Sequence, residues 1–442
     1  MGCRIAVFGT GYLGATHAAC MADLGHTVVG VDVDAAKLAR LASGAAPFFE
    51  PGLDEVLRAN VDAGRLRFTS SYEEAADFAD IHFIAVATPQ KKGDLAADLT
   101  YVDSVVTTLA PLLTRPAVIF GKSTVPVGTA ARLSDSARRI APAGDAVDIA
   151  WNPEFLREGF AVQDTLHPDR IVLGVDPERP GRAEEVAREI YGTIIDEGVP
   201  FIVTDRETAE LVKTAANAFL ATKISFINAM ADVCEAAGAD VSELADAIGH
   251  DARIGRRFLN AGIGFGGGCL PKDIRAFMAR AGELGANEAS TFLGEVDNIN
   301  VKRRTRLVEM AREIAGGSLM GMNVAILGAA FKPDSDDIRD SPALDIAGQV
   351  QLQGASVTIY DPKALENCRR DFPALNYASD VRGACQQADL ILVLTEWDAF
   401  RNIEPADLDP IVRDRRIIDG RNCLDRSKWR NSGWEYRGMG RR

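Results

Sequence analysis

A glycine pattern near the start of the chain restricts its fold more than any other feature. The apolar run Arg4–Phe8 leads into Gly9-Thr10-Gly11-Tyr12-Leu13-Gly14, and a second apolar run, Thr27–Val31, follows. This spacing predicts a strand, a helix over Gly11–Leu24 and a second parallel strand. Such a strand–turn–helix unit binds the pyrophosphate of a dinucleotide at the helix N-terminus.

Each glycine of this pattern has a separate expected task, and an acidic residue completes the unit. Gly9 makes the tight turn, Gly11 admits the pyrophosphate, and Gly14 lets the helix pack closely on the strand. Asp32, which ends the second run, would accept hydrogen bonds from the adenosine ribose hydroxyls. Its charge would repel a 2′-phosphate, so the sequence favours NAD over NADP.

Polar residues follow the next three apolar runs. Strands are predicted over Ile81–Ala87, Ala117–Phe120 and Val147–Trp151. Ligands of parallel sheets lie beyond the carboxyl ends of the strands, so the hydroxyls there can reach a ligand, although each can also cap a helix or a turn. These hydroxyls belong to Thr88, Ser123 and Thr124. After the third run, Glu154 and Glu158 lie four residues apart, and spacing alone favours an exposed pair over acid–base chemistry.

The last third of the chain repeats the strand–turn–helix plan with a degenerate glycine pattern. Strands are predicted over Asn323–Leu327, Ser356–Tyr360, Leu390–Leu394 and Arg416–Ile418, with a helix over Ser341–Gln353. This second doubly wound domain is suited to a nucleotide of another kind. The basic tail after Asp425 is predicted to be poorly ordered.

A long helical segment separates the two domains. Arg206–Ala237 contains no Pro or Gly and carries an apolar stripe, which suits a helix that joins domains or forms a dimer contact. Lys213 and Asn217 share one face of it, although a solvated position is the more ordinary interpretation of Lys213 alone. The predicted fold is α/β, with two Rossmann-like doubly wound domains joined by a long central helix. The predicted domains are residues 1–205, 206–315 and 316–442.

The segment Gly262–Asp273, GIGFGGGCLPKD, combines glycines with one cysteine. Residues Asp273–Ala286 carry apolar side chains at helical spacing, and Pro271 suits the first turn of the helix that they predict, so Cys269 would lie just before a helix N-terminus that favours a thiolate. The glycines would let a ligand approach the backbone. A flexible loop with an ordinary buried cysteine is the competing interpretation.

Composition excludes several classes of function. The net charge of −14 argues against non-specific binding to nucleic acid or anionic membranes. No apolar run approaches the length of a membrane span, and we expect no signal peptide, because the first residues lead straight into a strand-like run without an h-region. The seven cysteines are scattered and form no CxxC pair, so neither a disulfide framework nor a metal site is predicted. A reducing cytoplasm is the expected location.

Six motifs in the same order resemble the UDP-glucose 6-dehydrogenase family of nucleotide-sugar dehydrogenases. They are residues 9–14, 122–126, 152–158, 213–217, 253–273 and 332–340, and the most specific stretch is RIGRRFLNAGIGFGGGCLPKD. The resemblance implies oxidation of UDP-glucose to UDP-glucuronate with two NAD⁺, through a thiohemiacetal and a thioester on Cys269. It also implies a homodimer or higher homo-oligomer built on the central helix, with the product used for a polysaccharide or a glycolipid.

The resemblance also assigns expected roles to individual residues. The implied catalytic set is Cys269, Lys213, Asn217, Asp273, Thr124 and Glu158. The implied NAD contacts are Gly9, Gly11, Tyr12, Leu13, Gly14, Asp32, Lys37, Thr88, Thr124, Glu154 and Arg339. The implied contacts to the sugar nucleotide are Glu154, Phe155, Leu156, Lys213, Asn217, Arg253, Phe258, Gly266 and Lys332, with Arg253 reaching across from a second subunit.

Other activities remain open at this point. GDP-mannose 6-dehydrogenase is the nearest alternative within the group, and UDP-N-acetylmannosamine dehydrogenase fits the Leu270–Asp273 pattern less well. A two-electron dehydrogenase of the 6-phosphogluconate type would leave Cys269 structural. A non-catalytic NAD-binding regulator gives no reason for Lys213, Asn217, Cys269 and Asp273 to occur together.

Overall fold

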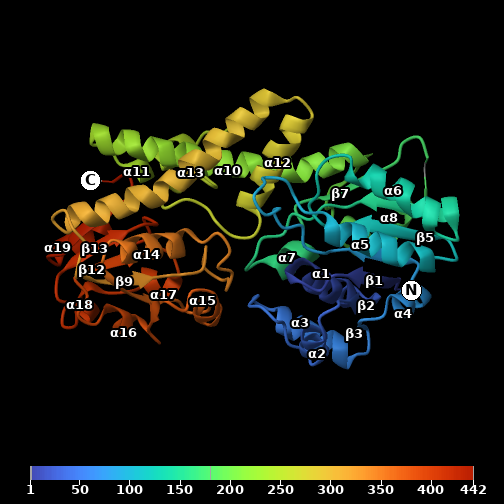
Figure 1. The fold of residues 1–442 in the computed structure, drawn as a ribbon, viewed down its shortest axis with the longest axis horizontal. Coiled ribbons are helices and arrows are strands. Elements are labelled where there is room, and N and C mark those ends of the chain that lie inside the picture. The colour runs from blue at the N-terminus through green and yellow to red at the C-terminus, as the bar shows by residue number, and fades with distance from the viewer. Residues whose placement is uncertain (1, 180, 442) are drawn as a thin grey trace. The chain divides into compact units, whose positions relative to one another are not determined.

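The chain forms two compact units in a computed structural model that describes residues 2–179 and 181–441 (Figure 1). The first unit comprises residues 1–216 and the second comprises residues 217–442. The boundary lies inside helix α10 (Arg206–Ala237), which is continuous because it contains neither Gly nor Pro.

The first unit is built on an eight-stranded sheet. The strand order is β3-β2-β1-β4-β5-β6-β7-β8, and neighbouring strands are parallel except at the β6–β7 pair. The first six strands have the dinucleotide-binding order 3-2-1-4-5-6, with the reversal between β1 and β4. Their bounds are β1 Arg4–Phe8, β2 Thr27–Val31, β3 Leu66–Thr69, β4 Ile81–Ile84, β5 Ala117–Gly121, β6 Val147–Trp151, β7 Ile171–Val175 and β8 Phe201–Asp205.

Helices cover both faces of this sheet through two separate apolar clusters. One cluster packs α1, α3 and α8 against the strands, and the other packs α4, α5 and α6. Side-chain caps at Asp34 and Ser71 start α2 and α4. The helices are α1 Tyr12–Asp23, α2 Ala35–Ala42, α3 Leu53–Asp62, α4 Tyr72–Phe78, α5 Thr100–Leu109, α6 Thr129–Ile140, α7 Ala161–Leu166, α8 Ala183–Ile190 and α9 Gly192–Asp196.

The second unit contains a six-stranded parallel sheet in the order β11-β10-β9-β12-β13-β14. Counted from its own first strand, this is again 3-2-1-4-5-6. The strands are β9 Asn323–Leu327, β10 Ser356–Tyr360, β11 Asn376–Tyr377, β12 Leu390–Val393, β13 Arg416–Asp419 and β14 Glu435–Gly438. The helices are α11 Val241–Gly249, α12 Leu270–Glu283, α13 Asn287–Ile314, α14 Pro342–Leu352, α15 Leu365–Asp371, α16 Val381–Cys385, α17 Asp398–Arg401, α18 Pro405–Leu408 and α19 Arg426–Asn431.

The predicted elements match the observed ones to within one residue at most ends, and two of them differ by three residues. Strand β4 ends at Ile84 instead of Ala87, because Ala85 forms the last ladder contact to β1 and the chain then turns toward Thr88. Helix α12 has Pro271 in its first turn, as predicted, but it ends at Glu283 instead of Ala286, because Gly285 has φ +77° and leaves the helical conformation.

The prediction of a poorly ordered tail after Asp425 is wrong. The segment forms α19 and then β14, which pairs with β13 as the sixth strand of the sheet. Trp429 and Trp434 are buried, with ring centroids 4.9 Å apart in an edge-to-face arrangement. The basic charges are compensated in part by Asp240, which pairs with both Arg426 and Arg441. The prediction relied on the many arginines of this segment and overlooked its aromatic residues, which are buried in the core.

Candidate active site

The glycine turn after β1 is shaped for a ligand. Gly9 has φ +90°, a conformation that favours glycine, and a Cβ at Gly14 would collide with the carbonyl of Gly9. Gly11 has an ordinary φ of −69°, and a Cβ there would meet no protein atom. The fold therefore gives no reason for glycine at position 11, whereas a pyrophosphate lying against the N-terminus of α1 does.

Asp32 lies beside this turn at the end of β2. Its Oδ2 accepts hydrogen bonds from the Thr10 backbone N–H at 2.8 Å and the Thr10 hydroxyl at 2.9 Å, and it pairs with Lys37 Nζ at 2.9 Å. Burial opposes the charge, but the hydrogen bonds from Lys37 and Thr10 outweigh burial and hold the pKa of Asp32 below its usual value. Asp32 is therefore a fixed anion, suited to accept hydrogen bonds from ribose hydroxyls.

Glu154 and Lys213 form a buried ion pair in the first unit. Glu154 Oε1 lies 2.9 Å from Lys213 Nζ, and Glu154 Oε2 accepts the Leu156 backbone N–H at 2.7 Å. Lys213 and Glu158 are both buried. The predictions of an exposed glutamate pair and of a solvated Lys213 are therefore wrong. Spacing alone could not show that the segment after β6 folds against the first turns of α10.

The segment that carries both glutamates is anchored by Glu50, which sequence analysis missed. Glu50 is buried, and its carboxylate accepts the backbone N–H groups of Gly159 at 2.6 Å and Ala161 at 2.7 Å. The Tyr12 hydroxyl bonds the same carboxylate and accepts the Gly159 N–H at 3.0 Å. Tyr12 thus connects the glycine turn to the acidic segment through its side chain.

The residues that follow β4 and β5 lie at the same edge of the sheet. The Thr88 hydroxyl donates to the Thr124 carbonyl at 2.8 Å, and the Ser123 hydroxyl donates to the Val86 carbonyl at 2.7 Å. These bonds fix the two loops to each other and leave the Thr124 side chain half-buried. Lys122 is buried beside them. Burial, opposed by Glu154 and assisted by nearby Lys213, lowers its pKa to about 8.

In the second unit, Cys269 occupies the N-cap position of α12, with Pro271 in the first turn. Its backbone carbonyl accepts the Asp273 N–H at 3.0 Å. The Asp273 carboxylate is almost completely buried, accepts the Asn217 amide at 2.7 Å and pairs with Lys272. The fold therefore brings the Asn217 amide to the helix N-terminus that carries the Cys269 thiol and the Asp273 carboxylate. Backbone dipoles favour negative charge at this position.

The glycines before Cys269 are explained by close packing within the second unit. A Cβ at Gly264 would strike the Asn300 side chain, one at Gly266 the Asp340 carbonyl, and one at Gly267 the Phe331 ring. The expectation that these glycines admit a ligand is therefore incomplete, because the groups that approach them are the chain's own. Asn300 fixes the loop by binding both the N–H and the carbonyl of Phe265, at 2.7 and 3.0 Å.

The remaining predicted contacts in the second unit lie on loops. The Arg253 side chain is 88% exposed and bonds Asp251 through two of its nitrogens. Phe258 has φ +66°, a strained conformation for a bulky residue. Lys332 Nζ lies 5.3 Å from the centre of the Phe331 ring, and Arg339 bonds Asp337 at 2.7 Å. Arg253 therefore points to solvent, and its predicted contact to a second subunit stays a prediction.

The chain is similar to known proteins along most of its length. Residues 3–195 match the NAD binding domain of the UDP-glucose/GDP-mannose dehydrogenase family, residues 207–302 its central domain and residues 325–426 its UDP binding domain. The chain belongs to this family.

Two curated members of the family and one solved structure illustrate the similarity. The chain is 42% identical to UDP-glucose 6-dehydrogenase of Rhizobium meliloti (strain 1021), over 99% of both proteins. It is 40% identical to UDP-glucose 6-dehydrogenase TuaD of Bacillus subtilis (strain 168), over 99% of this chain and 93% of that protein. The structure of a UDP-glucose dehydrogenase from Pyrobaculum islandicum superimposes with a TM-score of 0.91 at 35% identity, covering 100% and 98% of the two chains. The predicted family and fold class are confirmed.

Within the part matched to the UDP binding domain, Arg421 is a further residue that sequence analysis missed. It follows β13 and donates to the carbonyls of Leu394, Gly264 and Phe331 at 2.9, 2.8 and 3.1 Å. It thereby holds the loop before Cys269 against the loops after β9 and β12. The sequence did contain a signal for Arg421, because this residue follows a predicted strand and therefore lies at the carboxyl edge of the sheet, as Lys332 does.

The described residues of this family member contain no candidate metal site and no candidate membrane span. In residues 2–179 and 181–441, no three His, Cys, Asp or Glu side chains are grouped so that they could hold a metal ion. No helix in the same ranges combines the length and the apolar character needed to span a bilayer.

Proposed function

We propose that this chain is an NAD-dependent UDP-glucose 6-dehydrogenase that oxidises UDP-glucose to UDP-glucuronate. The observation that carries the proposal is the position of Cys269 at the N-cap of α12, next to the buried Asp273–Asn217 pair. A thiol so placed is suited to attack an aldehyde carbon. The names of the R. meliloti and B. subtilis relatives support the choice of substrate.

The reaction converts the C6 alcohol to a carboxylate in two oxidations. In the first, C6 loses a hydride and its hydroxyl loses a proton, which leaves an aldehyde. The Cys269 thiolate then adds to the aldehyde carbon, and the oxygen takes a proton to give a thiohemiacetal. In the second oxidation this carbon loses a hydride and the hydroxyl loses a proton, so that a thioester forms. Water displaces the thiol and releases the acid.

Bound NAD⁺ would supply the hydride acceptor for each oxidation, and the open position at Gly11 together with Asp32 fits it. Gly9, Gly14, Tyr12, Leu13, Lys37, Thr88 and Arg339 complete the proposed contacts. Lys213 and Asn217 stabilise developing negative charge on the C6 oxygen. Asp273, Thr124 and Glu158 hold or move protons and orient the attacking water. Glu154, Phe155, Leu156, Phe258, Gly266, Lys332 and a second subunit's Arg253 bind the sugar nucleotide.

A direct substrate comparison tests this proposal. The purified chain is supplied with NAD⁺ and either UDP-glucose or GDP-mannose, and the product is identified by mass spectrometry. We expect UDP-glucuronate to form, with a kcat/KM for UDP-glucose that exceeds the value for GDP-mannose by at least about a hundredfold. Preferential oxidation of GDP-mannose would contradict the assignment of UDP-glucose as the substrate, but it would not contradict the thiol mechanism.

Substitution of Asp32 by alanine should weaken NAD and relax its discrimination from NADP. The variant removes a charged hydrogen-bond acceptor and the repulsion of a 2′-phosphate, so we expect the NAD/NADP preference to fall about tenfold or more. The preference is measured as the ratio of kcat/KM for the two cofactors. Asp34→Asn is the matched control, since it removes a charge two residues away and can still cap α2. An unchanged preference in Asp32→Ala would exclude Asp32 from the ribose site.

We also propose that two copies of the chain associate through α10. Phe219, Phe226 and Val233 lie seven residues apart on one face of this helix and are 67%, 48% and 56% exposed. A regular apolar stripe of this kind is typical of a helix that pairs with another. Phe226→Lys should raise the dimer dissociation constant at least about tenfold in sedimentation equilibrium. Leu352→Lys, at an isolated exposed leucine of α14, should not change it; equal effects would locate the contact elsewhere.

The proposed chemistry also bears on location and organisation. Cys269 must remain a thiol, and none of the seven cysteines, all of which lie in the described residues, forms a disulfide, so we propose a reducing cytoplasm as the location. The division into residues 1–205, 206–315 and 316–442 stays a prediction. The product, UDP-glucuronate, is suited to the synthesis of a polysaccharide or a glycolipid.

A further inference from the structure

The loop that carries Cys269 is packed against the segment Phe331–Ser341 of the same unit. The Gly267 N–H donates to the Arg339 carbonyl at 2.9 Å, and the Gly268 N–H donates to the Asp337 carboxylate at 3.2 Å. A Cβ at Gly268 would collide with the Arg339 guanidinium. The segment that carries the proposed nucleotide contacts Lys332 and Arg339 is therefore hydrogen-bonded to the loop that carries Cys269 and packs directly against it.

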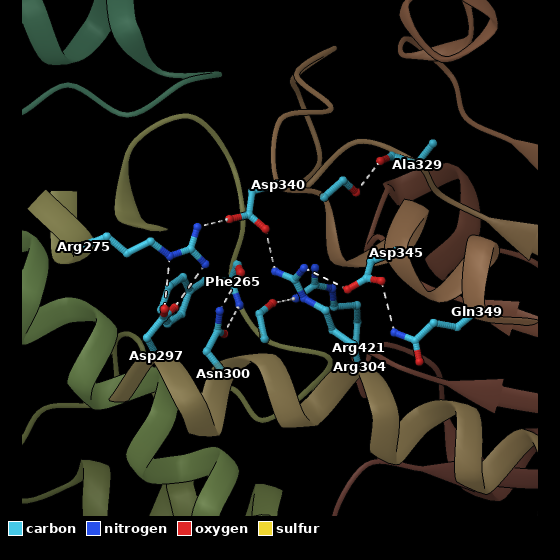
Figure 2. A network of polar contacts seen from close by, with 12 residues as sticks. Phe265, Arg275, Asp297, Asn300, Arg304, Ala329, Asp340, Asp345, Gln349 and Arg421 are labelled. Carbon is cyan, nitrogen blue, oxygen red and sulfur yellow. Dashed lines mark hydrogen bonds and ion pairs between the residues drawn. The ribbon is translucent and has the colours of Figure 1, made fainter. Parts of the chain in front are cut away.

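Asp340, at the end of this segment, bridges two helices (Figure 2). Its Oδ2 accepts Arg275 Nη1 of α12 at 3.1 Å, and its Oδ1 accepts Arg304 Nη2 of α13 at 2.8 Å. Each arginine has a second carboxylate partner, Asp297 for Arg275 at 3.1 Å and Asp345 for Arg304 at 3.0 Å. In Figure 2, Asp340 lies between the two guanidinium groups, whereas Asp297 and Asp345 lie on the outer side of each.

The backbone of Asp340 is also committed to this arrangement. Its φ is +46°, in the left-handed region that non-glycine residues rarely adopt, and its carbonyl is the group that Gly266 must avoid. Such a conformation persists only where the surroundings hold it, and here the two arginines and the glycine loop do so. Arg275 lies in the second turn of α12, so the bridge acts on the helix that presents Cys269.

We propose that Asp340 is a positioning residue that sets the orientation of Cys269 relative to the nucleotide-binding segment. The inference rests on the proposed role of Cys269 as nucleophile. By tying α12 and α13 to the residue that follows Arg339, the bridge makes the thiol loop and the Lys332–Arg339 segment one rigid body. Asp340 contacts no reacting atom itself. Its contribution is geometric, since displacement of a nucleophile by about 1 Å can cost about a hundredfold in rate.

Asp340→Asn isolates this role. Asparagine has the same shape and tolerates a positive φ, so the backbone conformation is preserved while the charge is lost. Arg275 and Arg304 each keep one carboxylate, which lets the fold survive. Asp345→Asn is the matched control, because it also removes a carboxylate from Arg304 but leaves both bonds of the bridge intact.

Turnover and thiol reactivity are measured on the full chain. For Asp340→Asn we expect kcat to fall about ten- to a hundredfold, with KM for UDP-glucose changed less than about threefold, because orientation and not binding is lost. The rate constant for alkylation of Cys269 by iodoacetamide should change at least about threefold. Asp345→Asn should keep all three values within about twofold of the parent chain.

Two results would overturn the proposal. One is an Asp340→Asn variant with unchanged kcat and unchanged alkylation of Cys269. The other is an Asp345→Asn variant with the same losses, which would show that loss of any carboxylate near Arg304 has this effect and that the bridge itself is not responsible. Alkylation needs no turnover, so this comparison decides the role of Asp340 even if UDP-glucose is not the substrate.

Discussion

Replacement of Cys269 by serine should lower UDP-glucuronate formation at least about a thousandfold while binding of UDP-glucose and NADH is retained. The reason is chemical. A serine hydroxyl is hardly ionised near neutral pH, and the N-terminus of α12 stabilises a thiolate far more readily than an alkoxide. The side chains are similar in size, so the loop that Asn300 and Arg421 hold should keep its conformation.

Steady-state assays of acid production and calorimetric dissociation constants measure the two properties separately. Cys423→Ser is the control, since Cys423 is half-buried, its sulfur contacts Asp419, and a hydroxyl can make the same contact. Its activity should stay within about twofold of the parent chain. Full activity in Cys269→Ser would make Cys269 a packing residue and would return the two-electron dehydrogenases to consideration.

Asp273→Asn should lower kcat by about a hundred- to ten-thousandfold, with a smaller effect on KM. Asp273 is almost completely buried, and Asn217 and Lys272 both direct donors at its carboxylate, so the negative charge is held in place. Asparagine keeps the shape and can still accept from Asn217, but it cannot take a proton from water. We expect hydrolysis of the thioester to become the slow step.

The slow step should be visible before the steady state. A burst of NADH should precede slow turnover, and the mass of the intact protein should increase by that of the bound sugar nucleotide. Glu283→Gln serves as the control, because it removes one exposed carboxylate from the other end of α12. A kcat for Asp273→Asn within about threefold of the parent value would remove Asp273 from proton transfer.

Local patterns predicted the central strands of both sheets, because most of them are short apolar runs that end at glycine or at an acid, but they missed β3, β7, β8 and β11 toward the sheet edges. Both Asp32 and Asp361 end a second strand and accept backbone N–H groups of the turn after the first strand, from Thr10 in one unit and Ala329 in the other. The same plan therefore recurs where the glycine pattern is lost. Strand β14 was missed because the charged residues around it are visible in the sequence, whereas the burial of Trp429 and Trp434 becomes visible only once the sheet has formed.

The candidate site was less accessible from the sequence, since its groups depend on contacts between distant segments. Lys213 reads as a surface residue of a helix until Glu154, 59 positions earlier, folds against it. Glu50 lies in a loop with no motif of its own, yet it anchors the segment after β6. The glycines before Cys269 indicated close approach correctly, but only the structure identifies the approaching groups as Asn300, Asp340 and Phe331.

The amount of NADH formed per UDP-glucose consumed tests the central claim most directly. The assay uses a limiting, known quantity of UDP-glucose with excess NAD⁺ and is followed to completion. We expect a ratio of about two, since an alcohol that becomes a carboxylate through a thioester loses two hydrides. A ratio of about one would contradict the thiol mechanism, because oxidation would then stop at the level of a carbonyl and Cys269 would have no covalent role.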